Sequence, residues 1–281
     1  MKYDIVICGF GCAGMSFLFY ALQSTRLNHL NILVIDPQKT RENDRTWCYW
    51  AEEPLEIHPK NTPLISWNTF KVSHPEHGQV TRTLQDFNYY HIKGSDFYDA
   101  IFEQVTQFPN VHFLYEKVEN WAPLPQNSVC VQTENQRIEA RKIIWSIPEK
   151  PKQPTLKQVF VGWKVTFDRQ VVNPEAVTFM AFDKQDAHML GFYYVLPYSS
   201  DTALIEYTIY AKTPPEKAFF HQKLKEYLDS TYPDEPYTLE FEEQGAIPMS
   251  TLAPARSESH PQVIYTGTAG ACTKLPLDLP L

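Results

Sequence analysis

The first part of the chain alternates short apolar runs with one glycine-rich turn. Residues 3–8 are rich in β-branched side chains, which is typical of a strand, and the apolar stretch 15–23 has the length of a helix. Residues 31–36, NILVID, repeat the strand pattern and end on Asp36. The pattern predicts a strand, a turn, a helix and a second strand that closes on a carboxylate.

The turn between the first strand and the helix, GFGCAG at residues 9–14, matches G-x-G-x-x-G. This spacing often arises by chance, but the flanking elements and an acid about twenty residues later make it a dinucleotide-binding pattern. Gly9 would permit the tight turn, Gly11 the approach of a pyrophosphate, and Gly14 the close packing of helix on strand. Asp36 would accept hydrogen bonds from an adenosine ribose. FAD and NAD share this unit.

Farther along the chain, strand patterns dominate. They recur at residues 110–118, 128–133, 138–147, 159–167, 176–183, 189–197 and 202–211. Two segments with helical spacing of apolar residues, 95–107 and 214–232, predict helices. We expect an α/β fold in which residues 1–150 and 260–281 form the nucleotide-binding domain and residues 151–259 form a β-rich substrate domain.

Two later segments favour FAD over NAD. Residues 138–147 predict the strand that returns to the nucleotide sheet, and residues 263–270, VIYTGTAG, predict a late strand that meets another glycine turn. Gly267 and Gly270 of this turn would provide a second phosphate contact. In this order of elements the chain resembles glutathione-reductase-type flavoproteins, which implies a Rossmann-type FAD-binding domain.

Composition excludes several classes of partner. The net charge is −8 and no block of Lys and Arg occurs, so we expect no nucleic-acid partner. The five cysteines form no C-x-x-C pair, which argues against a disulfide framework or a zinc site and favours a reducing compartment. No apolar run is long enough for a transmembrane helix, and no H-E-x-x-H spacing indicates a catalytic metal.

A second motif, DRTWCYW at residues 44–50, follows the nucleotide strand. Composition alone favours a loop with two buried tryptophans. The motif nevertheless resembles the signature of lycopene cyclases, flavoproteins of carotenoid biosynthesis. Further segments match that family in the same order: Gly162-Trp163, FYYVLP at 192–197, ALIEYTIY at 203–210, EEQGAIPM at 242–249 and GTAG at 267–270.

This resemblance implies a lycopene β-cyclase, which converts the ψ-ends of lycopene to β-ionone rings and yields γ- and β-carotene. It also implies reduced FAD without net redox change, NADPH as the electron source, and Arg45 as a cofactor-binding residue. Lycopene is dissolved in bilayers, so we expect a cytoplasmic protein in peripheral contact with a membrane.

Cyclisation needs an acid, a site that excludes water from a cation, and a proton acceptor. Glu206 is the first candidate acid, although alternation places it on the less apolar face of its strand, where it could point to solvent. The match of IEYT to the essential glutamate motif of the family favours catalysis. Either Glu206 or the reduced flavin could deliver the first proton.

Glu243 is the second catalytic candidate, and Glu242 beside it would face the other way on a strand. A structural role near Gly245 is the alternative for both. Aromatic faces would stabilise the cation. The candidates are in segments matched to the family, and core packing is the alternative for each: Trp163, Phe192, Tyr194 and Tyr207.

The chain departs from the family pattern at three places. Val159 stands where relatives usually carry histidine, and Ala181 where many carry aspartate. Relatives continue past the GTAG turn, whereas this chain ends in ACTKLPLDLPL, with prolines that would interrupt a helix. A C-terminal truncation is therefore expected. An inactive remnant, or another lipid-directed FAD-dependent oxidoreductase, is the alternative function.

Overall fold

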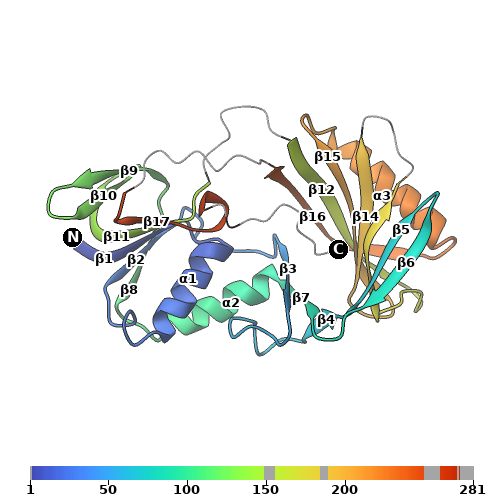
Figure 1. The fold of residues 1–281 in the computed structure, drawn as a ribbon, viewed down its shortest axis with the longest axis horizontal. Helices are drawn as coiled ribbons and strands as arrows, with labels where there is room; N and C mark the ends of the chain where they lie inside the picture. The colour runs from blue at the N-terminus through green and yellow to red at the C-terminus, as the bar shows by residue number, and fades with distance from the viewer. Residues whose placement is uncertain (1, 149–155, 184–188, 250–259, 271, 273–281) are drawn as a thin grey trace.

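The computed structural model describes residues 2–148, 156–183, 189–249, 260–270 and 272. Within these residues the strands form two seven-stranded sheets and one three-stranded sheet. Figure 1 shows the two large sheets at opposite ends of an elongated molecule, with the small sheet between them.

The first large sheet has the strand order β8-β2-β1-β11-β10-β9, and β17 pairs with β11. Its parallel part consists of β1 (Lys2–Cys8), β2 (Ile32–Ile35), β8 (Val111–Leu114), β11 (Arg137–Trp145) and β17 (Val263–Tyr265). The antiparallel pair β9 (Val118–Leu124) and β10 (Ser128–Thr133) extends one edge. A parallel sheet must be covered on both faces, which explains why β2 reads as an uninterrupted apolar run.

Two helices cover one face of this sheet (Figure 1). They are α1 (Cys12–Gln23) and α2 (Gly94–Val105). The apolar positions of both helices and the side chains of β1 and β2 share one buried cluster, which includes Ile7, Leu18 and Ile101. Burial of these side chains fixes α1 directly behind the glycine turn.

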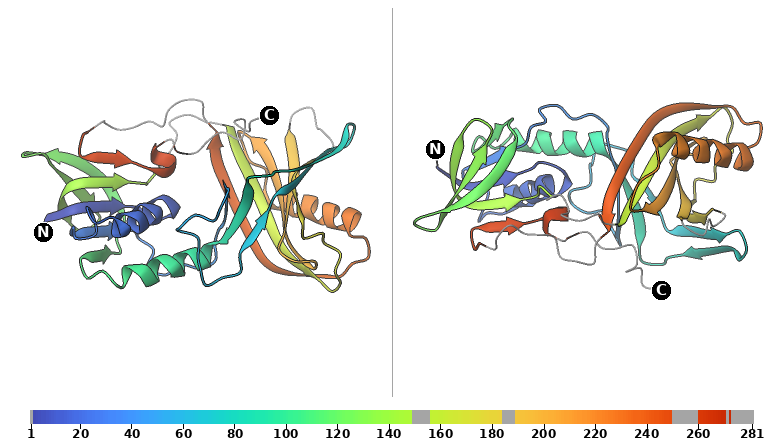
Figure 2. Two further views of the ribbon diagram at one scale, coloured as in Figure 1. Left: turned by 60° about the horizontal axis from the view of Figure 1, so that its bottom comes forward. Right: turned by 90° about the horizontal axis from the view of Figure 1, so that it is seen from above.

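The second large sheet has the order β16-β12-β15-β14-β13-β5-β6. Its strands are β5 (Thr69–His74), β6 (Gly78–Thr83), β12 (Leu156–Phe167), β13 (Ala176–Phe182), β14 (Leu190–Pro197), β15 (Thr202–Ala211) and β16 (Tyr237–Met249). Helix α3 (Lys217–Thr231) covers one face through Phe220, Leu224 and Leu228. The other face turns toward the first sheet (Figure 2).

The three-stranded sheet has the order β3-β7-β4 and packs against that other face. It consists of β3 (Thr46–Ala51), β4 (Ile65–Trp67) and β7 (Asn88–Lys93). Trp67 of β4 is buried and donates from Nε1 to the carbonyl oxygen of Pro197 at 3.1 Å. The DRTWCYW motif is thus largely a strand that faces the second sheet.

The α/β class and the strand, turn, helix and strand order of the N-terminal unit are confirmed. The predicted helices 95–107 and 214–232 correspond to α2 and α3. Strands β3 to β7 and β9 were not predicted, because their mixed sequences carry no clean alternation, and β16 was expected only around Glu242 and Glu243.

The division into two domains stays a prediction. The structure does show that β5 and β6, inside the range assigned to the nucleotide-binding domain, belong to the second sheet: β5 pairs with β13, and β6 pairs with β5. A local pattern does not identify a partner strand that lies about a hundred residues away. The C-terminal prolines of the expected truncation lie outside the described residues.

One glycine of the second sheet tests this packing. A Cβ added at Gly191 would lie 2.2 Å from the hydroxyl oxygen of Tyr207, which is 1 % exposed in the core beneath α3. We expect G191A to lower the free energy of unfolding by about 1–3 kcal/mol, because overpacking forces the ring to move. Urea unfolding monitored by circular dichroism measures the change, and an unaltered midpoint would contradict this packing.

Candidate functional site

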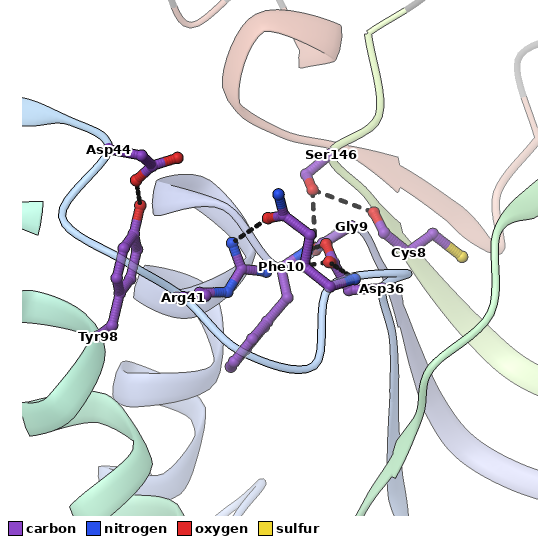
Figure 3. Close-up of polar contacts among 9 residues, drawn as sticks. Cys8, Gly9, Phe10, Asp36, Arg41, Asp44, Tyr98 and Ser146 are labelled. Carbon is purple, nitrogen blue, oxygen red and sulfur yellow. Dashed lines mark hydrogen bonds and ion pairs between the residues drawn. The ribbon is translucent and has the colours of Figure 1, made fainter. Parts of the chain in front are cut away.

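The N-terminal glycine turn leaves the sheet between β1 and α1. Gly9 has φ +88°, a conformation that favours glycine, and a Cβ there would lie 2.6 Å from Ser146 Oγ. Ser146 follows β11, and its Oγ lies 3.0 Å from the carbonyl oxygens of both Cys8 and Gly9 (Figure 3). The end of β11 therefore holds the turn in place.

The other two glycines of the motif have different surroundings. A Cβ at Gly14 would lie 2.2 Å from the carbonyl oxygen of Gly9, so only glycine allows α1 to approach β1 this closely. At Gly11 an added Cβ would meet no heavy atom of the described residues within 4 Å. Nor does any side chain in this part of the chain cap the N-terminus of α1, which begins at Cys12. Open space beside a bare helix N-terminus suits an anion such as a pyrophosphate.

Asp36 closes this turn from β2. Its Oδ2 accepts a hydrogen bond from the backbone N–H of Phe10 at 2.7 Å, and its Oδ1 accepts one from Gln38 at 2.9 Å. Nη2 of Arg41 lies 3.0 Å from the same Oδ1 (Figure 3). Each carboxylate oxygen has two acceptor sites, so Oδ2 can still accept a ribose hydroxyl.

Arg41 is a site residue that the sequence did not indicate. Its side chain is 7 % exposed, and its guanidinium lies 5.3 Å from the ring centroid of Tyr98. Nη1 donates to Gln38 at 3.1 Å, but the buried Nε has no hydrogen-bond partner among the residues that the structure describes. An unpaired buried donor is costly, so a ligand acceptor would stabilise it. A single arginine in a polar loop carries no sequence signal from which its place in the site could be predicted.

The second glycine turn lies beside the first. GTAG forms a short 3₁₀ turn, η1 (Gly267–Gly270), after β17 (Figure 1). A Cβ at Gly267, where φ is +59°, would lie 2.7 Å from Cβ of Ala13 in α1. A Cβ at Gly270 would lie 2.7 Å from the carbonyl oxygen of Tyr265. Six of the predicted cofactor residues thus converge at the two turns, with open space beside Gly11, whereas the seventh, Arg45, lies at a different cavity.

A second candidate site lies between β3 and the open face of the second large sheet. It is a cavity of about 210 Å³. Four of the predicted site residues line it: Arg45, Tyr194, Glu206 and Glu243. Arg45 precedes β3 and its side chain is about half exposed, 3.8 Å from Asp44. Segments almost two hundred residues apart therefore contribute to one cavity.

The register of the second sheet creates this arrangement. Tyr194 of β14 lies opposite Glu206 of β15, and Glu206 lies opposite Gly162 of β12. Gly162 also lies opposite Glu243 of β16. Directly opposed residues share a face of a sheet, so these four positions form one row across four strands. We call it the Glu206 row.

Glu206 is half-buried and its carboxyl group faces the cavity. Burial raises its pKa to about 8, a hydrogen bond from Thr208 opposes this rise, and the nearby charge of Glu243 adds to it. Thr208 Oγ1 lies 2.5 Å from Oε1 of Glu206. A carboxyl group with this pKa is protonated at neutral pH and can act as an acid.

Glu243 is 7 % exposed, and burial raises its pKa. Hydrogen bonds from Thr46 and the charge of Arg45 oppose that rise and favour the carboxylate. Glu242 points the other way: it forms ion pairs with Lys217 and with His221, whose Nε2 lies 2.8 Å away. The structure thus brings Glu243, and not its neighbour, to the cavity.

Two of the predicted aromatic residues lie on the α3 face of the second large sheet, opposite to the cavity. Trp163 follows Gly162, so it points toward α3, where its Nε1 donates to Glu242 at 2.8 Å. Tyr207 follows Glu206 and is buried in the core beneath α3. Strand alternation is the reason, because the residues that follow Gly162 in β12 and Glu206 in β15 point to the opposite face of the sheet. These two positions cannot contact a ligand in this cavity.

Phe192 lies on the same face as Tyr194, with the ring centroids 5.2 Å apart, but it is buried and does not line the cavity. The departures from the family pattern lie elsewhere. Val159 and Ala181 both pack into the hydrophobic cluster beneath α3. The side chains at these two positions therefore leave the cavity lining unchanged.

Sequence reasoning missed most of the aromatic residues near the cavity. Tyr89 of β7 lines it, and the ring of Trp50 in β3 lies 4.7 Å from that of Tyr89. Phe179 joins these rings to Tyr194, at centroid distances of 5.9 Å and 5.4 Å. We call Trp50, Tyr89, Phe179 and Tyr194 the aromatic cluster. Trp50 belongs to the DRTWCYW motif, and this motif is the sequence feature from which the aromatic cluster could have been predicted.

A larger cavity of about 550 Å³ adjoins the first and shares Thr46 with it. His58 and His91 line this cavity and are both buried. Burial, assisted by the charges of His58 and Lys164, lowers the pKa of His91 to about 4, so it is neutral at physiological pH. None of the predicted site residues lines it.

Among the described residues one group has side chains close enough to hold a metal ion: His74, Glu76 and His77 at the β5–β6 turn. The backbone N–H of Glu76 donates to Nδ1 of His74 at 3.1 Å, and the two imidazole rings stack. These three residues line neither cavity. Over the same part of the chain, no helix combines the length and apolarity that a bilayer crossing requires.

A comparison with protein families matches residues 4–275 to the model described as lycopene cyclase protein. No curated protein matches the sequence. The family match covers both glycine turns and every residue of the Glu206 row.

Solved structures with a similar fold come from several flavin-related groups. The p-nitrophenol 4-monooxygenase of Pseudomonas putida has a TM-score of 0.65 and 12% identity, over 95% of this chain and 73% of that chain. A geranylgeranyl bacteriochlorophyll reductase-like protein of Thermoplasma acidophilum has a TM-score of 0.65 and 10% identity, over 96% and 72%. A tryptophan halogenase of Shewanella frigidimarina has a TM-score of 0.61 and 13% identity, over 95% and 66%. These similarities confirm the Rossmann-type fold of FAD-binding enzymes.

The pKa of Glu206 predicts a pH-dependent stability. The folded carboxyl group keeps its proton up to about pH 8, whereas the ordinary value is 4.5, so stability falls as the pH rises between these values. At pH 9 we expect the free energy of unfolding of E206Q to exceed that of the unsubstituted protein by about 3 kcal/mol. At pH 5 the two free energies of unfolding should differ little. Urea unfolding at pH 5, 7 and 9 measures this.

E242Q is the matched control. Although burial raises the pKa of Glu242, contacts with Lys217 and Trp163 hold it below its usual value, so this substitution should not stabilise the protein at high pH. An equal gain in both variants would contradict a proton held specifically at Glu206.

Proposed function

The chain belongs to the lycopene cyclase family, and we propose on this basis that it cyclises the ψ-ends of lycopene to β-ionone rings. The products would be γ-carotene and β-carotene, formed without net redox change. The observation that carries this proposal is the Glu206 row, in which the half-buried Glu206 and the buried Glu243 lie opposite the same glycine and both line one cavity.

Ring formation adds one proton and removes one. A proton adds to the terminal double bond and leaves a tertiary cation, and the next double bond attacks this cation to form the ring bond. Loss of a ring proton then creates the ring double bond. The atoms of substrate and product are the same, so the site needs an acid, a proton acceptor and protection of the cation from water.

The surroundings of the two glutamates suit opposite roles. Glu206, with a pKa of about 8, would donate the proton. Burial raises the pKa of Glu243 as well, whereas hydrogen bonds from Thr46 and the charge of Arg45 oppose that rise; as a carboxylate, Glu243 would accept the ring proton. Tyr194 and Tyr89 would face the developing charge, worth on the order of 1–2 kcal/mol for each ring.

The convergent glycine turns would hold FAD, with the pyrophosphate beside Gly11 and the ribose on Asp36. Bound FAD, reduced at the expense of NADPH, would supply electron density that favours a nearby cation. Gly9, Gly14, Gly267 and Gly270 would act through the backbone, because each permits a close approach that a side chain would prevent.

The substrate is a hydrocarbon that partitions into bilayers, so the proposed enzyme must take it from a membrane. We propose a cytoplasmic protein in peripheral contact with the membrane surface. The competing function, oxidation or reduction of another lipid, would share the dinucleotide turn but would not need two acids on either side of a glycine.

Flavin binding can be tested at Gly11. Because a side chain there meets no neighbour, we expect G11V to keep the melting temperature within about 2 °C while it weakens FAD binding at least tenfold. Flavin fluorescence titration of the purified protein measures the affinity. Retention of full FAD affinity in G11V would show that the pyrophosphate does not lie at this turn.

Cyclisation can be tested in a lycopene-accumulating host. We expect γ- or β-carotene with the unsubstituted chain, and a loss of rate of about 10²–10⁴-fold in E206Q and E243Q, since each removes one proton-transfer group. Pigments are separated by chromatography and normalised to folded protein. E242Q, on the opposite face of β16, should retain activity.

Unchanged lycopene in the presence of soluble, flavin-loaded protein would refute the cyclase. Consumption of one NADPH for each lipid altered would favour the oxidoreductase alternative, and failure to bind flavin would favour an inactive remnant.

A further inference from the structure

The face of the second large sheet that carries the Glu206 row continues past the cavity toward the start of β12. Leu156, the first residue of β12, is on this face and lies about 20 Å along the strand from Gly162. Two further rows of directly opposed residues cross β14, β15, β12 and β16 in the same register. The first is Phe192, Thr208, Phe160 and Gly245, and the second is Leu190, Tyr210, Gln158 and Ile247.

The far end of this face is apolar and exposed. Ile247 and Leu156 are each 40 % exposed, and Leu190 is 38 % exposed. Gln158, the amide of the second row, is buried. Exposed apolar side chains that gather on one face indicate a binding site for an apolar ligand or partner.

This apolar surface is continuous with the cavity that contains the two acids. Phe160 and Ile247 line the cavity together with Glu206 and Glu243. Because Ile247 is also exposed, it belongs both to the cavity lining and to the outer surface. A ligand that lies against Ile247 can therefore extend from the cavity onto the open face.

Aromatic rings follow the same direction on the two neighbouring strands. The ring of Tyr194, which lines the cavity, lies 5.2 Å from the ring of Phe192. The ring of Phe192 lies 6.0 Å from that of Tyr210, which is directly opposite Leu190. These side chains connect the cavity to the exposed end of the face.

The volume of the cavity, about 210 Å³, limits what it can enclose. Pockets that enclose a drug-sized ligand measure about 300–1,000 Å³. A compact end group of a carotenoid fits in the smaller volume, whereas the long conjugated chain must lie outside the cavity. The apolar face that leads away from the cavity matches the hydrocarbon character of that chain.

We propose that the conjugated chain of the substrate lies along this face while one of its end groups occupies the cavity. We call the strip formed by Phe160, Tyr210, Ile247 and Leu156 the polyene track. This inference rests on the proposed cyclase function. An extended conjugated chain is flat and rigid, so it suits the surface of a sheet. Only one end of lycopene can occupy the cavity at a time, and the second end reacts after release and rebinding.

A lipid bilayer or a second copy of the chain could also cover exposed apolar side chains. Neither would require the apolar surface to continue inward and line a cavity beside two acids, as Phe160 and Ile247 do. The continuity with the cavity therefore favours the substrate as the occupant.

The test is I247N, with L239N as the matched control. Both replace an exposed aliphatic residue of β16, but Leu239 lies opposite Val165 and so shares the α3 face of the sheet. Quenching of tryptophan fluorescence by lycopene in detergent micelles measures binding to the full chain. We expect I247N to raise the Kd about tenfold, because it removes an apolar contact with the conjugated chain, and L239N to leave it within about twofold.

Kinetics give a second measurement. We expect I247N to raise KM for lycopene about tenfold and to leave kcat unchanged, because Glu206 and Glu243 keep their places. L239N should keep both constants, and unfolding curves establish the folded fraction of each variant. A loss of kcat in I247N with KM unchanged would contradict a role in holding the substrate.

Two further measurements decide between the occupants. Lycopene-free phosphatidylcholine vesicles should bind I247N and the unsubstituted protein equally, and both should elute as the same species in size-exclusion chromatography. Weaker vesicle binding by I247N would assign Ile247 to a lipid contact, and a changed oligomeric state would assign it to a second copy. Either result would overturn the polyene track.

Equal lycopene affinity in I247N and the unsubstituted protein would overturn the polyene track and leave the cyclase intact, and so would equal losses in I247N and L239N. If the unsubstituted protein binds lycopene without cyclising it, the proposed function fails and the binding comparison still decides the track. Absence of any lycopene binding by the unsubstituted protein would overturn both proposals.

Discussion

The pairing of β12 with β15 on one side and β16 on the other is the constraint on which the candidate site depends. Its register places Glu206 and Glu243 directly opposite the same glycine, although they lie in different segments of the chain. A slip of one residue in either pair would turn one carboxyl group toward α3. The hydrophobic cluster beneath α3 prevents such a slip, because it would expose the apolar side chains of that strand.

The two faces of this sheet have separate tasks. The α3 face buries an apolar core that includes Tyr207, Val159 and Phe220, and it holds the strands in register. The other face is only partly covered by the three-stranded sheet, which leaves room for the cavity and brings Tyr89 toward Glu206. Burial on this face raises the pKa of Glu206, so the same packing that encloses the cavity also prepares the acid.

The geometry of the N-terminal glycine turn, by contrast, depends almost entirely on the local sequence. Gly9 and Gly14 contact each other across the first turn of α1, and Asp36 is only one strand away. Such short-range geometry can be derived from spacing alone. The contribution of Arg41 could not be derived from spacing, because the burial of its side chain against Tyr98 depends on where α2 packs.

The sequence by itself determined the α/β class, the dinucleotide turn, the three helices and the identity of the acidic residues, because periodicity and glycine spacing are local properties. Family resemblance singled out Glu206 where alternation alone favoured solvent exposure. Only the tertiary structure decided which neighbour of each pair faces the cavity: Glu243 and not Glu242, Glu206 and not Tyr207. The physical reason is that a strand's alternation defines two faces, while the partners packed on each face decide which becomes core and which becomes cavity.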